Sequence, residues 1–254
     1  MITPAPHHLN ADAFDPKLGA IDSEELTRHV PVAALTNRRE KLTRIFQIGF
    51  NKCGTRSLYR FLQRNGIHSA HFNRGMLAQR IQENIDGGRK PLFGRKINAF
   101  VGYTDLQRIT FHGAIEAATY YRQFFEYYPN SYFILNTRDK DGWLASRKAH
   151  GAGNYINRYR VALGLPDETS VLSYWSDQWD QHHEEVQSYF KNKPGRLIVY
   201  DIKTDHPQKM VDFLSPDFFT LPELFRHEGV TTKVDAESYR KNAPIDLKNN
   251  RRIS

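Results

Sequence analysis

The chain alternates short apolar runs with helical stretches, and this alternation constrains its fold more than any other feature. The first unit is an apolar run at residues 44–50, a glycine-containing loop, and a helical pattern over residues 54–65. The other expected elements are strands at residues 68–72, 99–104, 131–137 and 196–200 and helices at residues 74–86, 113–128, 140–150, 170–191 and 207–214. Strands that alternate with helices pair through right-handed crossovers, so the pattern predicts an α/β fold: a central parallel sheet flanked by helices.

The chain has room for one large domain and is short for two, with 254 residues. Residues 1–41 show little periodicity and are expected to form an N-terminal extension. The α/β domain is expected to span residues 42–222, followed by a polar, basic tail at residues 223–254. Within the domain, residues 151–166 are rich in Gly, Tyr and Arg, a composition that favours a lid or insertion.

The charge balance indicates the kind of ligand. A net charge of +8 favours an anionic partner such as a nucleotide, an acidic glycan or nucleic acid. No apolar run approaches the roughly 18 residues that cross a bilayer, and residues 1–40 carry no apolar stretch behind a basic start. The sequence therefore predicts no membrane span and no secretory signal. We expect a cytoplasmic location. One cysteine cannot form an internal disulfide or a cysteine zinc site, and no His, Asp or Glu spacing predicts a metal site.

The loop at residues 49–55 has the outline of a phosphate-binding loop, with its lysine in an unusual place. Gly49, Gly54 and Thr55 match G-x-x-x-x-G-[ST], and such a turn points backbone N–H groups at one place. A nucleotide triphosphatase loop carries its lysine directly after the second glycine. Lys52 instead lies inside the loop, where it can reach the bridging oxygen of a bound anhydride as that bond breaks. This placement favours transfer of the outer group over metal-dependent hydrolysis.

Two other interpretations of the loop are open at this point. It could be a turn whose basic side chains are merely solvated. Alternatively, Cys53 could be a nucleophile, since a helix N-terminus lowers the pKa of a thiol. The Cys-x5-Arg loop of phosphatases would need arginine at position 59, where this chain has Tyr59; the nearby arginines are Arg56 and Arg60.

The segment KCGTRSL, residues 52–58, resembles the 5′-phosphosulfate loop of sulfotransferases that use 3′-phosphoadenosine 5′-phosphosulfate, whose core is Lys-x-Gly-Thr. Residues 196–214 are similar to the late strand and helix of bacterial members. The resemblance implies a P-loop-like sulfotransferase architecture, with adenosine 3′,5′-bisphosphate as product and no metal requirement. It places Lys52 at the leaving-group oxygen and makes the anion cradle from Cys53, Gly54, Thr55, Arg56 and Ser57.

A donor with a 3′-phosphate needs a second anion site. The strand pattern at residues 131–137 ends at Arg138, and Ser146 lies about two turns into the following helix. This is similar to the family's 3′-phosphate segment, which places arginine eight residues before serine. The alternative is that Arg138 pairs with Asp139 or Asp141 and that Ser146 is an ordinary helix residue.

The C-terminal tail and one tryptophan complete the expectations for the donor. The segment SYRKN at residues 238–242 gives Arg240 and Lys241 as candidates for the 3′-phosphate, as C-terminal basic residues serve in relatives, although the family's Arg-Lys-Gly is absent. The tail is therefore expected to pack on or near the donor site. Trp143 is expected in the core rather than stacked on adenine.

Transfer to a hydroxyl also needs a base beside the attacking oxygen. Residues 103–107 are similar to the Thr-His-Leu-Pro segment of cytosolic family members, whose His is the base, but here the position holds Asp105. Near basic residues an aspartate is a weak base unless burial raises its pKa, and Asp105 could instead be a helix cap or an ion-pair partner. His112 is the second candidate base, or a cap of the next helix. His68 and His71 could line an acceptor cleft.

The sequence thus predicts a sulfotransferase with a hydroxyl or amine acceptor, which could be a glycan or small metabolite. The basic residues 87–96 and the aromatic and basic residues 155–160 could flank an acidic or glycan acceptor. One alternative is a nucleotide-dependent phosphotransferase such as a kinase. Another is a noncatalytic anion-binding or nucleic-acid-binding module, suggested by the net charge, although charge runs are usually solvated and a nucleic-acid partner is not expected.

Overall fold

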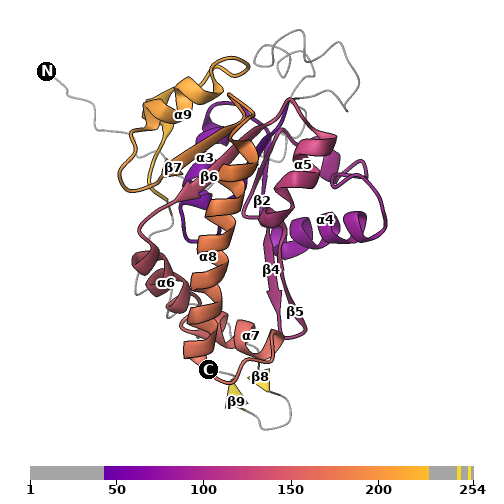
Figure 1. Cartoon of the computed structure of the whole chain (residues 1–254), viewed down its shortest axis with the longest axis vertical. Coiled ribbons are helices and arrows are strands. Elements are labelled where there is room, and N and C mark those ends of the chain that lie inside the picture. The colour runs from indigo at the N-terminus through magenta and orange to yellow at the C-terminus, as the bar shows by residue number, and fades with distance from the viewer. Residues whose placement is uncertain (1–42, 229–244, 247–250, 253–254) are drawn as a thin grey trace, which may run out of the picture.

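The computed structural model describes residues 43–228, 245–246 and 251–252, the last two ranges forming the short strands β8 (Ile245–Asp246) and β9 (Arg251–Arg252) (Figure 1). The expected extension at residues 1–41 and the candidates Arg240 and Lys241 lie outside the described residues. The domain boundaries drawn from the sequence stay predictions.

A five-stranded parallel sheet occupies the centre of the fold, which confirms the predicted α/β architecture (Figure 1). The strand order is β2-β3-β1-β6-β7. The strands are β1 (Ile45–Gln47), β2 (Ser69–His71), β3 (Gly102–Thr104), β6 (Tyr132–Thr137) and β7 (Leu197–Asp201). The strands β2 and β3 lie on one side of β1, and the later strands β6 and β7 lie on its other side, so the strand order reverses at β1. In open parallel sheets, ligands bind in the crevice beyond the carboxyl end of such a strand.

Helices cover both faces of the sheet because successive side chains of each strand point to opposite faces. Ile45 of β1 packs with helices α3 (Thr55–Arg64) and α9 (Pro207–Leu214). Its neighbour Phe46 lies in the other cluster, with α4 (Met76–Asp86), α5 (Tyr121–Tyr127) and the long α8 (Glu168–Phe190). Figure 1 shows α8 running along most of the molecule's length. Short 3₁₀ turns lie at residues 73–75, 97–99, 117–120 and 222–224. No helix among the described residues is long and apolar enough to cross a membrane.

The helix predicted at residues 113–128 was wrong in its first part. Residues there form an antiparallel hairpin of β4 (Gln107–Thr110) and β5 (Gly113–Glu116), and helical structure begins only at residue 117. Phe111 and His112 make the turn and are both exposed. His112 therefore caps no helix. The hairpin is stabilised by tertiary packing, since α4 and α7 (Asn154–Ala162) lie against it.

The predicted lid at residues 151–166 is mostly a packed helix, α7 (Asn154–Ala162). Its side chains Tyr155, Ile156 and Tyr159 are buried against α8, in a cluster that also contains Trp143 and Trp175. Trp143 belongs to α6 (Lys140–Lys148), and its indole N–H donates to the carbonyl of Asn51 at 2.9 Å. Trp143 is therefore a core residue, as expected. Asp139 caps α6 and accepts from the backbone N–H of Gly142 at 2.7 Å.

A buried ion pair connects α6 to the hairpin. The guanidinium of Arg147 is fully buried and bonds the carboxylate of Glu116, which also accepts from the hydroxyl of Tyr159. Five aromatic rings surround the guanidinium at 4.8 to 5.5 Å, so its other N–H groups face π electrons rather than water. The pair ties three elements together beneath the site described below.

Removing the guanidinium should be costly because it leaves the Glu116 carboxylate buried and unpaired. Arg147→Met is expected to lower the free energy of unfolding by about 3–5 kcal/mol. Urea denaturation followed by circular dichroism measures this. The matched control is Arg122→Met, which breaks the solvent-exposed pair with Glu185 and should cost at most about 1 kcal/mol. Equal losses in the two variants would contradict the stabilising role of the buried pair.

Candidate functional site

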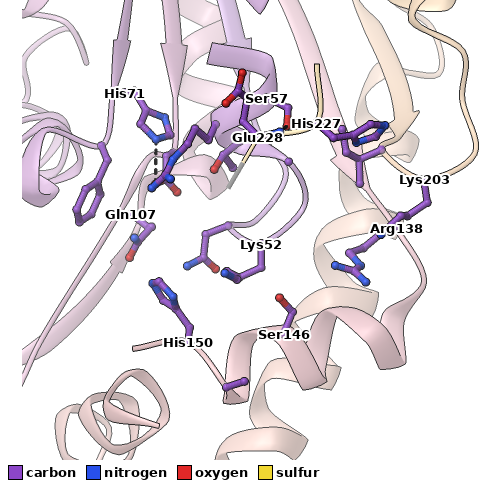
Figure 2. Close-up of a pocket in the computed structure, with 18 residues that line it drawn as sticks. Lys52, Ser57, His71, Gln107, Arg138, Ser146, His150, Lys203, His227 and Glu228 are labelled. Atoms are coloured by element: carbon purple, nitrogen blue, oxygen red, sulfur yellow. Dashed lines mark hydrogen bonds and ion pairs between the residues drawn. The ribbon is translucent and has the colours of Figure 1, made fainter. Parts of the chain in front are cut away.

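A cavity of about 630 Å³ lies beyond the carboxyl ends of β1, β3 and β6, where the strand order reverses (Figure 2). The structure brings most of the expected site residues to this one place. Those that line the cavity are Lys52, Gly54, Thr55, Arg56, Ser57, His71, Asp105, Arg138 and Ser146. Figure 2 shows Lys52 from the loop and Ser146 from α6 facing the same space from opposite sides.

The loop between β1 and α3 has an uncommon backbone. Lys52 and Gly54 both have positive φ, 68° and 78°. A side chain at Gly54 would be strained at that φ, and its Cβ would lie 2.5 Å from Ile202. No side chain of the described residues caps the N-terminus of α3, which begins at Thr55. Its first N–H groups are therefore left for an anion in the cavity.

Two buried amides hold the loop in this conformation. Asn136, near the end of β6, accepts from the backbone N–H of Gly49 at 3.0 Å and donates to the carbonyl of Cys53 at 2.8 Å. Gln47 donates to the side-chain oxygen of Asn136 and accepts from the backbone N–H of Asp105 at 2.7 Å. Both ends of the loop and Asp105 are thus fixed to the centre of the sheet, so the site is preorganised.

Positive charge dominates the cavity. Lys52, Arg56, Arg138 and Lys203 line it. Nε of Arg138 lies 3.5 Å from the carboxylate of Asp139, so the ion pair expected as an alternative does form, while the side chain still lines the cavity. Four basic side chains on one cavity suit a ligand with several negative charges.

The chain beyond η6 (Pro222–Leu224) passes over the start of α3. The backbone N–H of Glu228 donates to the hydroxyl of Ser57 at 2.8 Å, and His227 and Glu228 line the cavity. The carboxylate of Glu228 pairs with Arg64, so its charge is balanced. Whether the rest of the tail packs there stays a prediction.

Asp105 follows β3 with a φ of 55°, and its side chain is 13% exposed. Burial, helped by the charge of Glu116 and opposed by Lys52, Arg56 and Arg147, raises the pKa of its carboxyl group from 3.8 to about 7. Asp105 therefore gains and loses its proton near neutral pH, which is what a general base needs.

His71 lies beside Asp105, with Nε2 3.8 Å from Oδ2, the contact marked by the dashed line in Figure 2. Its Nδ1 lies 3.0 Å from the hydroxyl of Thr104, whose own hydrogen is donated to the carbonyl of Ala70. Nδ1 must then be the donor, which leaves a lone pair on Nε2 facing Asp105. Burial and the charges of Arg56 and Arg60 lower the pKa of His71 to about 4, so the ring is neutral at pH 7.

Three candidates do not reach the cavity. Cys53 is fully buried in the aromatic cluster, and burial raises the pKa of its thiol, so it can contribute only backbone groups and is no nucleophile. His112 is exposed at the hairpin turn and His68 is exposed beside Phe100; neither lines the cavity. None of residues 155–160 lines this cavity, although the buried hydroxyl of Tyr155 accepts from the side chain of the lining residue Asn51.

Other lining residues escaped the sequence analysis, including Asn51, Gln107, His150 and Lys203. Lys203 could have been found, because it follows a strand whose carboxyl end lies at the same edge of the sheet. His150 follows α6, and burial together with the charges of Lys52 and Arg147 lowers its pKa to about 4. Within the described residues, no three His, Cys, Asp or Glu side chains cluster as a metal site, and the metal requirement stays untested.

Comparison with known proteins places this site in a family. A search of curated proteins found no match. A family model described as a sulfotransferase domain matches residues 44–181, a segment that runs from just before β1 into α8. It contains the loop with Lys52, Asp105, and both Arg138 and Ser146. The match covers more than half of the chain, and the chain therefore belongs to the sulfotransferase domain family.

Proposed function

We propose that this protein transfers a sulfuryl group from 3′-phosphoadenosine 5′-phosphosulfate to a hydroxyl or amine of an acceptor, and that no metal takes part. One observation carries the proposal: the loop with Lys52 and the pair Arg138 and Ser146, 86 to 94 residues apart in sequence, line one basic cavity. The donor carries anionic groups at both ends of its ribose, and the cavity offers cations on both sides.

The residues present fit such a donor. The N-terminus of α3 and the side chains of Thr55 and Ser57 would hold the phosphosulfate, and Lys52 would contact the bridging oxygen. Arg138, Ser146 and Lys203 would hold the 3′-phosphate. Because Asn136 and Gln47 fix the loop, its hydrogen-bonding groups are in place before the ligand arrives. This lowers the reorganisation needed during transfer.

Asp105 would take the acceptor proton. The acceptor oxygen forms the new bond to sulfur, and its proton passes to the carboxylate of Asp105. The bond between sulfur and the bridging oxygen breaks, and the electron pair stays on that oxygen, where the ammonium of Lys52 stabilises it. The lone pair on Nε2 of His71 faces Oδ2 of Asp105 at 3.8 Å, so an approach of about 1 Å would let it accept a hydrogen bond from the protonated Asp105, which would make His71 a positioning residue.

Calorimetry with adenosine 3′,5′-bisphosphate, without metal, tests the donor class. Binding is expected to depend on the 3′-phosphate, so that AMP binds far more weakly. Arg138→Ala should weaken binding by about 10- to 100-fold, because a charge-assisted contact is lost.

Arg122→Ala, a change at an exposed arginine on α5, is the matched control and should bind normally. A preference for ATP with Mg²⁺ would select the phosphotransferase alternative. Salt-sensitive binding of an oligonucleotide without affinity for the bisphosphate would select the noncatalytic one.

A further inference from the structure

A second cavity, of about 890 Å³, adjoins the first. It lies between β2, α4 and the segment at residues 87–100, and His71 is the one described residue that lines both cavities. The ring of His71 stacks on Tyr59 of the second cavity, with centroids 4.8 Å apart, and presents Nε2 to Asp105 of the first. A molecule in the second cavity would therefore end beside Asp105, without occupying the loop or the position of Arg138.

The second cavity is partly apolar. Met76 and Phe93 are 44% and 59% exposed, which is unusual for large apolar side chains, and both line it. Ile97 and Phe100 add further apolar surface. Exposed apolar side chains gathered on a concave surface mark a binding site for an apolar group.

Its rim is basic. Arg80, Arg89, Arg95 and Lys96 line the cavity, and none of the described lining residues is acidic. Arg80 pairs with Glu83, and Arg89 bonds Asn84 and lies over the ring of Phe93. Within residues 43–228, Arg95 and Lys96 make no ion pair, and both are exposed. These two side chains are available to a ligand with a negative group.

We propose that this second cavity binds the sulfuryl acceptor, and that the acceptor is a small amphipathic anion: an apolar, preferably aromatic body that carries an acidic group. The inference rests on the proposed function. The apolar body packs on Met76, Phe93 and Phe100, the acidic group meets Arg95 and Lys96, and the reacting hydroxyl or amine passes His71 toward Asp105. A purely polar glycan would leave the apolar wall exposed to water, so it fits less well.

Fluorescence titration with 6-hydroxy-2-naphthoate tests the cavity, with 2-naphthol as the neutral analogue and glucuronate as an anion without an apolar body. The naphthoate should bind at least about tenfold more tightly than 2-naphthol. Arg95→Glu/Lys96→Glu should abolish that preference, and Phe93→Ser should weaken both aromatic ligands. Glucuronate should not compete.

The control variant Lys191→Glu/Lys209→Glu has the same change in net charge at exposed lysines outside both cavities, and should keep the preference. All variants should bind adenosine 3′,5′-bisphosphate as the unchanged protein does. Equal binding of naphthoate and naphthol, no naphthoate binding at millimolar concentration, or a preference that survives the double substitution would overturn the proposal. So would competition by the bisphosphate, which would assign the cavity to the donor. If the unchanged protein did not bind the bisphosphate, that result would instead contradict the donor assigned under the proposed function.

Discussion

Lys52→Ala is expected to lower the turnover number by about 10²–10³-fold, the typical loss when one group that stabilises developing charge is removed. The expected reason is the position of Lys52 inside the preorganised loop, where we propose that its ammonium contacts the leaving-group oxygen. Affinity for adenosine 3′,5′-bisphosphate should fall much less, because the α3 N-terminus, Arg138 and Ser146 remain. Single-turnover transfer of labelled sulfate, with calorimetry on the same samples, separates the two effects.

The backbone at Lys52 makes alanine a suitable replacement. A φ of 68° strains lysine and alanine alike, so the substitution does not change the conformational preference of the loop. Lys52→Met, which keeps most of the stem, should behave as alanine does. Lys209→Ala, on the exposed surface of α9, should leave turnover unchanged. Normal turnover in both Lys52 variants would show that another group stabilises the leaving oxygen.

Local signals in the sequence predicted the sheet and the loop. Position 54 has a positive φ, which favours glycine. A glycine between a strand and a helix therefore predicts such a turn without any knowledge of distant contacts. Asp139 is a helix cap whose bond closes within three residues. The placement of Arg138 and Ser146 could also be predicted locally, because Arg138 follows the end of a strand and Ser146 lies on the helix that comes next. Such features depend on neighbours along the chain.

What the sequence could not predict depends on distant contacts. The hairpin at residues 107–116 has no glycine or asparagine turn of the usual kind, and its faces are covered by α4 and α7. From the sequence, Arg147 would be taken for a solvent-exposed helix residue. Only the fold places Glu116 and five aromatic rings around its guanidinium. The raised pKa of Asp105 likewise requires its burial and the charge of Glu116. The sequence therefore predicted Asp105 as a candidate base from its position, whereas its raised pKa follows only from the fold.

Asp105→Asn is expected to lower kcat/KM by about 10²–10⁴-fold, the usual contribution of a general base. Asparagine is nearly isosteric and tolerates the φ of 55°, so the backbone should be retained. In the unchanged protein, kcat/KM should rise tenfold per pH unit below about pH 7 and level off above it, because only ionised Asp105 accepts the proton. Asparagine does not titrate, so the variant's residual activity should lack this rise. A pH profile of both proteins measures it.

The same substitution should stabilise the fold at alkaline pH. The folded carboxyl group holds its proton up to about pH 7 and the unfolded one only to about 3.8, so stability falls as pH rises between these values. Asparagine removes that loss, so Asp105→Asn should raise the free energy of unfolding at pH 8 by up to roughly 4 kcal/mol, measured by urea denaturation, and should change it little at pH 4. Asp139→Asn, at the exposed cap of α6, should show no such gain.

The two outcomes for Asp105→Asn have different meanings. A variant that is inactive and also less stable at pH 8 would mark Asp105 as a structural residue. A variant that is inactive but more stable identifies a carboxylate kept for its chemistry at the expense of stability.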